Sequence, residues 1–280
     1  MPTERAISFP SLSFKMEALY DGTLEGFFAL LQDAIASGKV PDRIRRAHPK
    51  SQQRDSSPGL FSEAELGSSL VSGPEQEQKS KAAMEKLRSC SEEAYRDCLQ
   101  AWMSEEAIET DIIRYAIGLL GSPNRSTVER LRTDRSFGPC QSVLRASQRF
   151  LREQDRLLGL LRFKPTREAY LLARCEPETF ALPALAEPLK RRFGTTAWAV
   201  QDERRHLVLS CDGSHEPELS AYDPENPPFS PPEGLVPDEY EALWQEYFHI
   251  ITIDSRKNPE LQKRLLPLRY WKYLPELPDR

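Results

Sequence analysis

The 280-residue chain is long enough for one large domain or two small ones, and its 39% of apolar residues can fill a sizeable core. It contains no run of about eighteen apolar residues and does not begin with the basic and then apolar pattern of a signal peptide, so we expect a cytoplasmic protein without a membrane span. The five cysteines are widely spaced with no Cys-x-x-Cys pair, so we predict neither a disulfide framework, nor a metal site, nor a cofactor.

The charge is unevenly distributed. The whole chain carries −5, yet residues 125–167 carry +7 and residues 256–273 carry +5, which leaves −17 on the rest. Two basic segments on an acidic chain suggest an anionic partner that meets one face of the protein.

The first predicted elements are a strand at about 12–20, a tight turn and a helix at about 24–35. Asp21 and Thr23 in the turn can cap the first free N–H groups of the helix. In one interpretation, this segment is a strand–turn–helix junction with no further function. The other is an anion site at the mouth of a pocket, with Asp21 and Glu25 as acid or base groups.

Residues from about 40 to 78 are rich in Pro, Ser, Gly, Gln and charge, which predicts a flexible insertion or linker that contributes little to the core. Apolar residues then recur at three- and four-residue steps through 79–121, which predicts two or three packed helices. With the following helix, they form a helical section at about 79–161.

The helix predicted at about 141–161 carries four arginines at i, i+4, i+7 and i+11, so their guanidinium groups share one outward stripe. The four are Arg145, Arg149, Arg152 and Arg156. Such a stripe fits an ordinary solvated helix, where Glu153 and Asp155 pair with some of the arginines. It also fits a surface that binds either the phosphates of a nucleic acid backbone or an acidic protein.

Two hairpin-like units follow, with strands near 160–164 and 169–174 and near 198–201 and 206–210, and a short helix at 183–193 lies between them. With the first strand, this makes a small antiparallel sheet of about five strands. Several helices pack on it. We therefore predict an α+β fold in a single domain over residues 1–280.

After a final helix at 237–251, the basic tail interleaves cations with aromatic residues. Cations hold phosphates and rings stack on exposed bases, so the pattern is typical of single-stranded or distorted nucleic acid binding. In the alternative interpretation, Trp271 and the neighbouring tyrosines fix the tail on the sheet. With the arginine stripe, the candidate nucleic-acid contacts are Arg162, Arg256, Lys257, Asn258, Arg269, Tyr270, Trp271 and Lys272.

Several motifs together resemble a bacterial family assigned to DNA metabolism or DNA repair. They are Tyr20-Asp21-Gly22-Thr23-x-Glu25-Gly26-Phe27, Arg152-Glu153-x-x-Arg156-x-x-Gly159-x-x-Arg162-Phe163, Glu176-Pro177 with Leu182-Pro183, Trp198 with Asp202 and Arg205, and Arg256-x-Asn258-Pro259 through Pro267-x-Arg269-Tyr270-Trp271-Lys272. The resemblance spans nearly the whole chain, and the two tail motifs are its most specific part.

The resemblance implies a companion of a radical SAM protein for DNA modification or repair. In some members a uracil-DNA glycosylase-like domain is fused after this one, so such a protein is a further expected partner and this chain is expected to be the stand-alone form. The sequence departs from the family pattern at Asp155 and Thr179, where members of the family often carry histidine. That departure places histidine-dependent chemistry in doubt.

Two functional hypotheses remain open. In the first, the chain is an accessory protein that binds DNA and acts with the radical SAM partner. In the second, it is a metal-dependent hydrolytic enzyme acting on nucleic acid through Asp21 and Glu25, with Glu176 and Asp202 as further candidate carboxylates.

Overall fold

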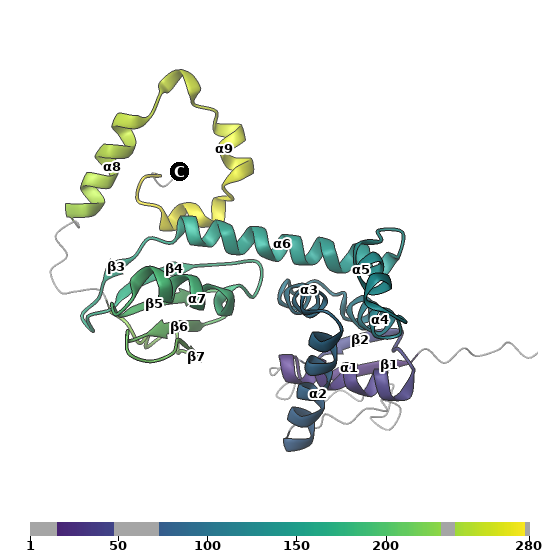
Figure 1. Ribbon diagram of the computed structural model, residues 1–280. Helices are drawn as coiled ribbons and strands as arrows, with labels where there is room; N and C mark the ends of the chain where they lie inside the picture. The colour runs from purple at the N-terminus through teal and green to yellow at the C-terminus, as the bar shows by residue number, and fades with distance from the viewer. Residues whose placement is uncertain (1–15, 48–72, 231–238, 278–280) are drawn as a thin grey trace, which may run out of the picture. The chain divides into compact units, whose positions relative to one another are not determined.

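The computed structural model describes residues 16–47, 73–230 and 239–277 (Figure 1). The chain divides into two compact units: unit 1 is Met1–Trp102 with Glu106–Ser147, and unit 2 is Met103–Glu105 with Gln148–Arg280. The expectation of a single domain over 1–280 stays a prediction. Each unit is described below by itself.

Unit 1 is mainly helical. Its elements are β1 (Glu17–Tyr20), α1 (Leu24–Ser37), β2 (Arg43–Arg46), α2 (Pro74–Cys90), α3 (Glu92–Met103, whose last residue is assigned to unit 2), α4 (Glu109–Leu120), α5 (Arg125–Thr133) and the first part of α6 (Gly138–Leu160). Helices α2 to α6 lie within or overlap the range 79–161, where a helical section was expected. The apolar stripe of α1 lies in the core of this unit, where Phe27, Phe28 and Leu31 are fully buried.

The first strand is not part of the large sheet. β1 pairs in parallel with β2, and together they form a separate two-stranded sheet. The part of the predicted strand before residue 16 lies outside the described residues. The flexible linker predicted at about 40–78 stays a prediction, and within its range the structure describes β2 near the start and the first turn of α2 near the end. Residues 48–72 are outside the described part of the chain.

Unit 2 contains a five-stranded sheet. Its elements are the second part of α6, β3 (Lys164–Pro165), β4 (Leu171–Cys175), α7 (Leu182–Phe193), β5 (Trp198–Asp202), β6 (Leu207–Cys211), β7 (Glu218–Ala221), α8 (Glu239–Ile251), the 3-10 turn η2 (Asp254–Arg256), α9 (Pro259–Leu265) and the 3-10 helix η3 (Leu268–Tyr273). The strand order is β3-β4-β5-β6-β7. The predicted α+β class is thus confirmed.

The sheet is mixed, not wholly antiparallel. β4 and β5 pair in parallel, while the other neighbours pair antiparallel. The reason is α7, which connects β4 to β5 and returns the chain to the same end of the sheet, as a crossover helix does. Trp198 on β5 and Leu185 and Leu189 on α7 are fully buried. Leu172 and Val208 belong to a separate buried cluster that Phe229 completes.

Candidate nucleic-acid interface

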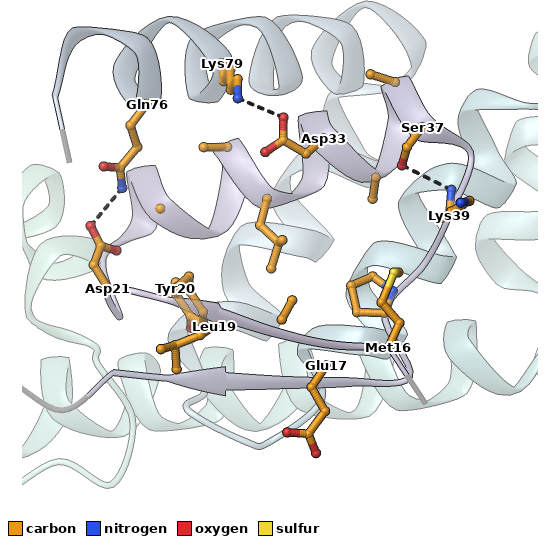
Figure 2. A pocket seen from close by; sticks show the side chains of 17 residues that line it. Met16, Glu17, Leu19, Tyr20, Asp21, Asp33, Ser37, Lys39, Gln76 and Lys79 are labelled. Atoms are coloured by element: carbon orange, nitrogen blue, oxygen red, sulfur yellow. Dashed lines mark hydrogen bonds and ion pairs between the residues drawn. The ribbon is translucent and has the colours of Figure 1, made fainter. Parts of the chain in front are cut away.

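The turn between β1 and α1 is a strand–turn–helix junction, as predicted. Asp21 Oδ1 accepts hydrogen bonds from the backbone N–H of Thr23 (2.9 Å) and from its hydroxyl (2.7 Å), and Asp21 Oδ2 accepts one from Gln76 Nε2 (2.8 Å). The Thr23 hydroxyl oxygen then accepts from the Gly26 N–H (3.0 Å), which caps α1. Figure 2 shows the bond from Gln76 on α2 to Asp21. The carboxylate of Asp21 therefore joins two elements.

Glycine is required twice in this junction. Gly22 has a φ of +81°, in the left-handed region, and a Cβ on Gly26 would lie 2.0 Å from Asp21 Oδ1. Asp21 borders a cavity of about 610 Å³ between β1 and α1, whereas Glu25 borders a different cavity of about 670 Å³ that Asp21 also reaches. Burial of Asp21 would raise its pKa, but its hydrogen bonds outweigh that effect and lower the pKa. This low pKa makes Asp21 a poor general base at neutral pH.

A buried polar network lies beside this junction, and the sequence did not predict the part that Arg46 and Glu109 play in it. Tyr20 donates its hydroxyl hydrogen to Glu109 (3.3 Å) and accepts a hydrogen bond from Trp102 Nε1 (3.2 Å). Arg46 from β2 pairs with Glu109 (2.6 Å) and lies over the Trp102 ring (5.2 Å). Burial raises the pKa of Tyr20. The segment around Arg46 gave no sign of this role, because it is polar and rich in arginine.

The other two candidate carboxylates lie in unit 2, each with a basic partner. Asp202 is fully buried, pairs with Arg205 (2.7 Å) and accepts from the backbone N–H groups of Arg204 and Arg205. Arg205 also binds Glu105 and the carbonyl oxygens of Pro177 and Glu178.

Glu176 pairs with Lys272 (2.6 Å). The described residues contain no group of three or more His, Cys, Asp or Glu side chains arranged to hold a metal ion. Asp21 and Glu25 belong to unit 1, and Glu176 and Asp202 belong to unit 2.

All four predicted stripe arginines lie on α6, as expected from their spacing. Arg145, Arg149 and Arg152 are exposed, with Arg145 in unit 1 and the other three in unit 2. Arg149 pairs with Glu178 (3.0 Å), and Arg156 is partly buried against Glu153 (3.3 Å). The stripe therefore mixes outward arginines with one that faces the interior of unit 2.

Glu153 is the centre of the tail's attachment, a role that the sequence analysis did not assign to it. It is buried on α6 and accepts hydrogen bonds from the Tyr270 hydroxyl, from Arg269 (3.2 Å) and from the backbone N–H of Glu178 (3.0 Å). Burial would raise the pKa of Glu153, but the bonds from Tyr270, from the Glu178 N–H and from Arg269 lower it overall. The residue is therefore held as a carboxylate inside unit 2.

The end of the tail, from Arg269 to Tyr273, is packed against other parts of unit 2. Arg269 also binds Glu178 (2.7 Å), Lys272 binds Glu176 (2.6 Å) and Glu203 (3.4 Å), and the Tyr273 hydroxyl donates to Glu203 (2.7 Å). Two of the tail's cations, Arg269 and Lys272, are thus paired with carboxylates from outside the tail.

The tail's aromatic residues are also engaged in this packing. Tyr270 is only 2% exposed, so its ring is closed to a stacking base, contrary to the prediction for this residue. Trp271 is partly exposed and donates from Nε1 to the Leu266 carbonyl (3.0 Å).

A cavity of about 650 Å³ lies where the tail meets β3 and β4. Cations, aromatic rings and apolar groups line it, together with Glu203; the residues are Arg162, Lys164, Pro165, Thr166, Leu172, Arg174, Glu203, Gln245, Trp271, Lys272, Tyr273, Leu274, Pro275 and Leu277. Arg162 pairs with Glu276 (2.6 Å). Arg174 is exposed on β4, and no ion-pair partner for it is found in the described part of the chain. The cavity therefore combines the two kinds of group predicted for a nucleic-acid contact.

The remaining predicted contacts lie before η3. Arg256 and Lys257 are exposed, and Lys257 pairs with Asp254 (2.6 Å). The Asn258 side chain accepts from the Leu261 N–H (3.0 Å) and caps α9. Asn258 thus has a local structural use, while nucleic-acid contact by Arg256 and Lys257 stays a prediction.

The family assignment follows from a comparison with known families. A family model described as a domain of unknown function, DUF4130, matches residues 108–276, which is more than half of the chain. The chain belongs to the DUF4130 family. Neither a curated protein nor a solved structure matches it. The matched range includes Glu153, the tail through Glu276 and every residue of the basic cavity except Leu277, whereas the β1–α1 junction lies outside it.

No helix in the described ranges is both long and apolar enough to span a membrane. All five cysteines are free, and burial raises the pKa of Cys98 and Cys175. These two thiols are therefore held in the protonated, weakly reactive form at neutral pH.

Proposed function

We propose that this DUF4130 chain is a DNA-binding accessory protein of DNA repair or DNA metabolism, and that it acts with a radical SAM enzyme. The observation that supports DNA binding is the basic and aromatic cavity of unit 2. Arg162, Lys164, Arg174 and Lys272 supply cationic groups, and Trp271 and Tyr273 supply rings around about 650 Å³. Cations neutralise phosphates and rings stack on bases, so one cavity offers both contacts that a nucleotide requires.

The charges around the cavity indicate which residue binds phosphate first. Arg162 is neutralised by Glu276, and Lys272 is held by Glu176 and Glu203. Arg174 is exposed without an ion-pair partner among the described residues, so its charge is available to a phosphate. Arginine binds phosphate through paired N–H groups, which makes it the stronger anchor.

The size of the cavity favours single-stranded or unstacked nucleic acid. Ligand cavities commonly measure about 300–1,000 Å³, and a double helix is too wide to enter a space of that size. A base turned out of its stack can enter, with its ring against Trp271 and its phosphate beside Arg174. Exposed Arg152 on α6 offers a further cation for the strand outside the cavity.

The partner proteins are supported by the sequence resemblance. The two motifs that hold the tail, around Arg152-Glu153 and Arg269-Tyr270-Trp271-Lys272, are also those that resemble the family paired with a radical SAM protein. On the same ground, a uracil-DNA glycosylase-like protein is a further expected partner. We do not propose the hydrolytic alternative, because Asp21 already accepts three hydrogen bonds and because Glu176 and Asp202 each bind a basic side chain.

Salt-dependent binding of labelled oligonucleotides tests the proposal. Fluorescence anisotropy should show that a single-stranded DNA binds more tightly than its duplex and that log K falls linearly with log salt. Arg174→Ala should lower the affinity and flatten the salt slope by about 0.7 for a single strand. Arg191→Ala, at an exposed arginine on α7 outside the cavity lining, is the matched control and should leave both quantities unchanged.

Two results would count against DNA binding at this cavity. One is an affinity for every DNA form that is undetectable or independent of salt. The other is an equal effect of Arg174→Ala and Arg191→Ala, because a specific cavity must distinguish a lining arginine from one outside it.

A further inference from the structure

The segment 242–268, called the arm, exposes an unusual amount of apolar surface. Nine of the twelve exposed large hydrophobic residues in the described part of the chain belong to it, namely Leu243, Trp244, Tyr247, Ile250, Ile251, Ile253, Leu261, Leu265 and Leu268. Figure 1 shows α8 and α9 as the two legs of an arch. Concentrated exposed apolar surface marks an interaction site on a soluble protein.

Each leg of the arm presents its apolar residues as a helical stripe. On α8, Leu243, Tyr247 and Ile250 follow the spacing i, i+4 and i+7, and Ile250 is 71% exposed. On the other leg, Leu261 and Leu265 are four residues apart on α9, and Leu265 is 63% exposed. This spacing places the side chains of each leg on one face, which suits packing against another helix.

The arm contacts the rest of unit 2 at α8 and, at its other end, at Leu266, whose carbonyl accepts from Trp271 Nε1 (3.0 Å). Arg162 lies over the Trp244 ring at 5.5 Å, and Gln245 Nε2 donates to the Pro275 carbonyl at 2.9 Å. These contacts hold one end of α8 and leave Ile250 and Leu265 exposed. The arm is therefore positioned by its own unit while its stripes are left uncovered.

The charges of the two legs are opposite. Within the arm, α8 carries Glu246 and no lysine or arginine, whereas α9 carries Lys263 and Arg264 in its last turn with one acidic residue, Glu260, which pairs with Lys263 (3.9 Å). A leg of one sign complements the other leg of a second molecule, and a two-fold axis then makes the contact twice. An anionic membrane surface fits less well, because Glu246 on α8 would be repelled by it.

We propose that the arm is a dimerisation element, in which α8 of one molecule packs against α9 of a second copy of this chain. The apolar stripes supply the buried surface, and the opposite charges fix which helix meets which. This inference is independent of the proposed DNA binding, since the proposed contact is made by the stripes of α8 and α9 and by no cation that lines the basic cavity.

The mass of the full chain in solution tests the dimer. Sedimentation velocity at micromolar concentration should give twice the 32.0 kDa of the chain. Ile250→Asp on α8 and Leu265→Asp on α9 should each raise the dimer dissociation constant at least about tenfold, and the double change Lys263→Glu/Arg264→Glu should do the same. Leu219→Asp, at a 37% exposed leucine on β7, is the matched control and should leave the dimer intact.

A mixing experiment tests which helices pair. If α8 packs on α9, a mixture of the Ile250→Asp and Leu265→Asp proteins restores one undamaged contact per dimer, so the mixture should associate more strongly than either variant alone. Pairing of α8 with α8 would be broken by Ile250→Asp but not by Leu265→Asp, which would overturn the proposed geometry. A wild-type monomer at every concentration, or a dimer indifferent to all arm variants, would overturn the dimer itself.

Discussion

Removal of the Tyr270 hydroxyl, by Tyr270→Phe, is expected to loosen the tail from unit 2 without creating a cavity. The hydroxyl donates to the buried carboxylate of Glu153, and a hydrogen bond to a charged group contributes about 1.5–3 kcal/mol. In the variant, Glu153 still accepts hydrogen bonds from Arg269, Arg156 and the Glu178 N–H, so its carboxylate keeps its other partners. We therefore expect a loss near the lower limit, about 1.5 kcal/mol.

Tyr270→Ala is expected to cost more, because it also removes a ring that is almost completely buried. Truncation of a buried aromatic side chain costs about 3–5 kcal/mol. Equilibrium unfolding in urea measures both losses. The control is Tyr222→Phe, because Tyr222 is partly exposed and its hydroxyl has no hydrogen-bond partner among the described residues, so the change should alter stability by less than about 0.5 kcal/mol. If Tyr270→Phe unfolds like wild type and like Tyr222→Phe, the Tyr270 hydroxyl does not hold the tail on unit 2.

Three further predictions concern the buried charges and the first turn. The pKa of Glu153 is lowered in the folded state, so its stabilising effect is complete above the unfolded pKa of about 4.3 and is lost as the pH falls through the folded pKa. The urea midpoint of the wild-type protein should therefore fall in acid, and that of Glu153→Gln should fall less. Gly26→Ala should destabilise unit 1 by about 1–3 kcal/mol, because the new Cβ clashes with Asp21. Gly159→Ala on α6 has open space around its Cβ and should stabilise the protein by about 0.5–1 kcal/mol, so similar melting temperatures for the two variants would contradict this prediction. Arg205→Ala leaves the buried Asp202 carboxylate without its basic partner and should lower the free energy of unfolding in urea by about 3–5 kcal/mol. A decrease of less than about 1 kcal/mol would show that solvent reaches Asp202.

Local patterns predicted the helices well and the tail contacts poorly. The stripes of α1 and α6 are encoded by neighbours three and four residues apart, so periodicity located both helices. Glu153 and Tyr270 are 117 residues apart, and neither segment carries a local pattern that predicts their contact. The tail's positive charge predicted an anionic partner, and that stays a prediction; what the charge pattern did not indicate is that Arg269 and Lys272 bind Glu153, Glu176 and Glu203 of the same unit.

The sheet shows the same limit. The antiparallel pairing of β5 and β6 was predictable, because a short polar turn separates two apolar runs. The parallel pairing of β4 and β5 depends on the path of α7 over the sheet, which no strand pattern specifies. β2 was missed because its four residues are polar apart from Ile44, and Arg46 acquires its meaning only through Glu109.

Hydrogen–deuterium exchange of the full chain, with and without a saturating single-stranded oligonucleotide, tests DNA binding at the basic cavity most directly. We expect slower exchange in the segments that line this cavity, 162–174 and 271–277, and along α6 near Arg152, with little change in β1 and α1. The same measurement on Arg174→Ala should show weaker protection at equal oligonucleotide concentration. Protection confined to unit 1, or no protection anywhere under conditions where binding is measured, would contradict DNA binding at this cavity.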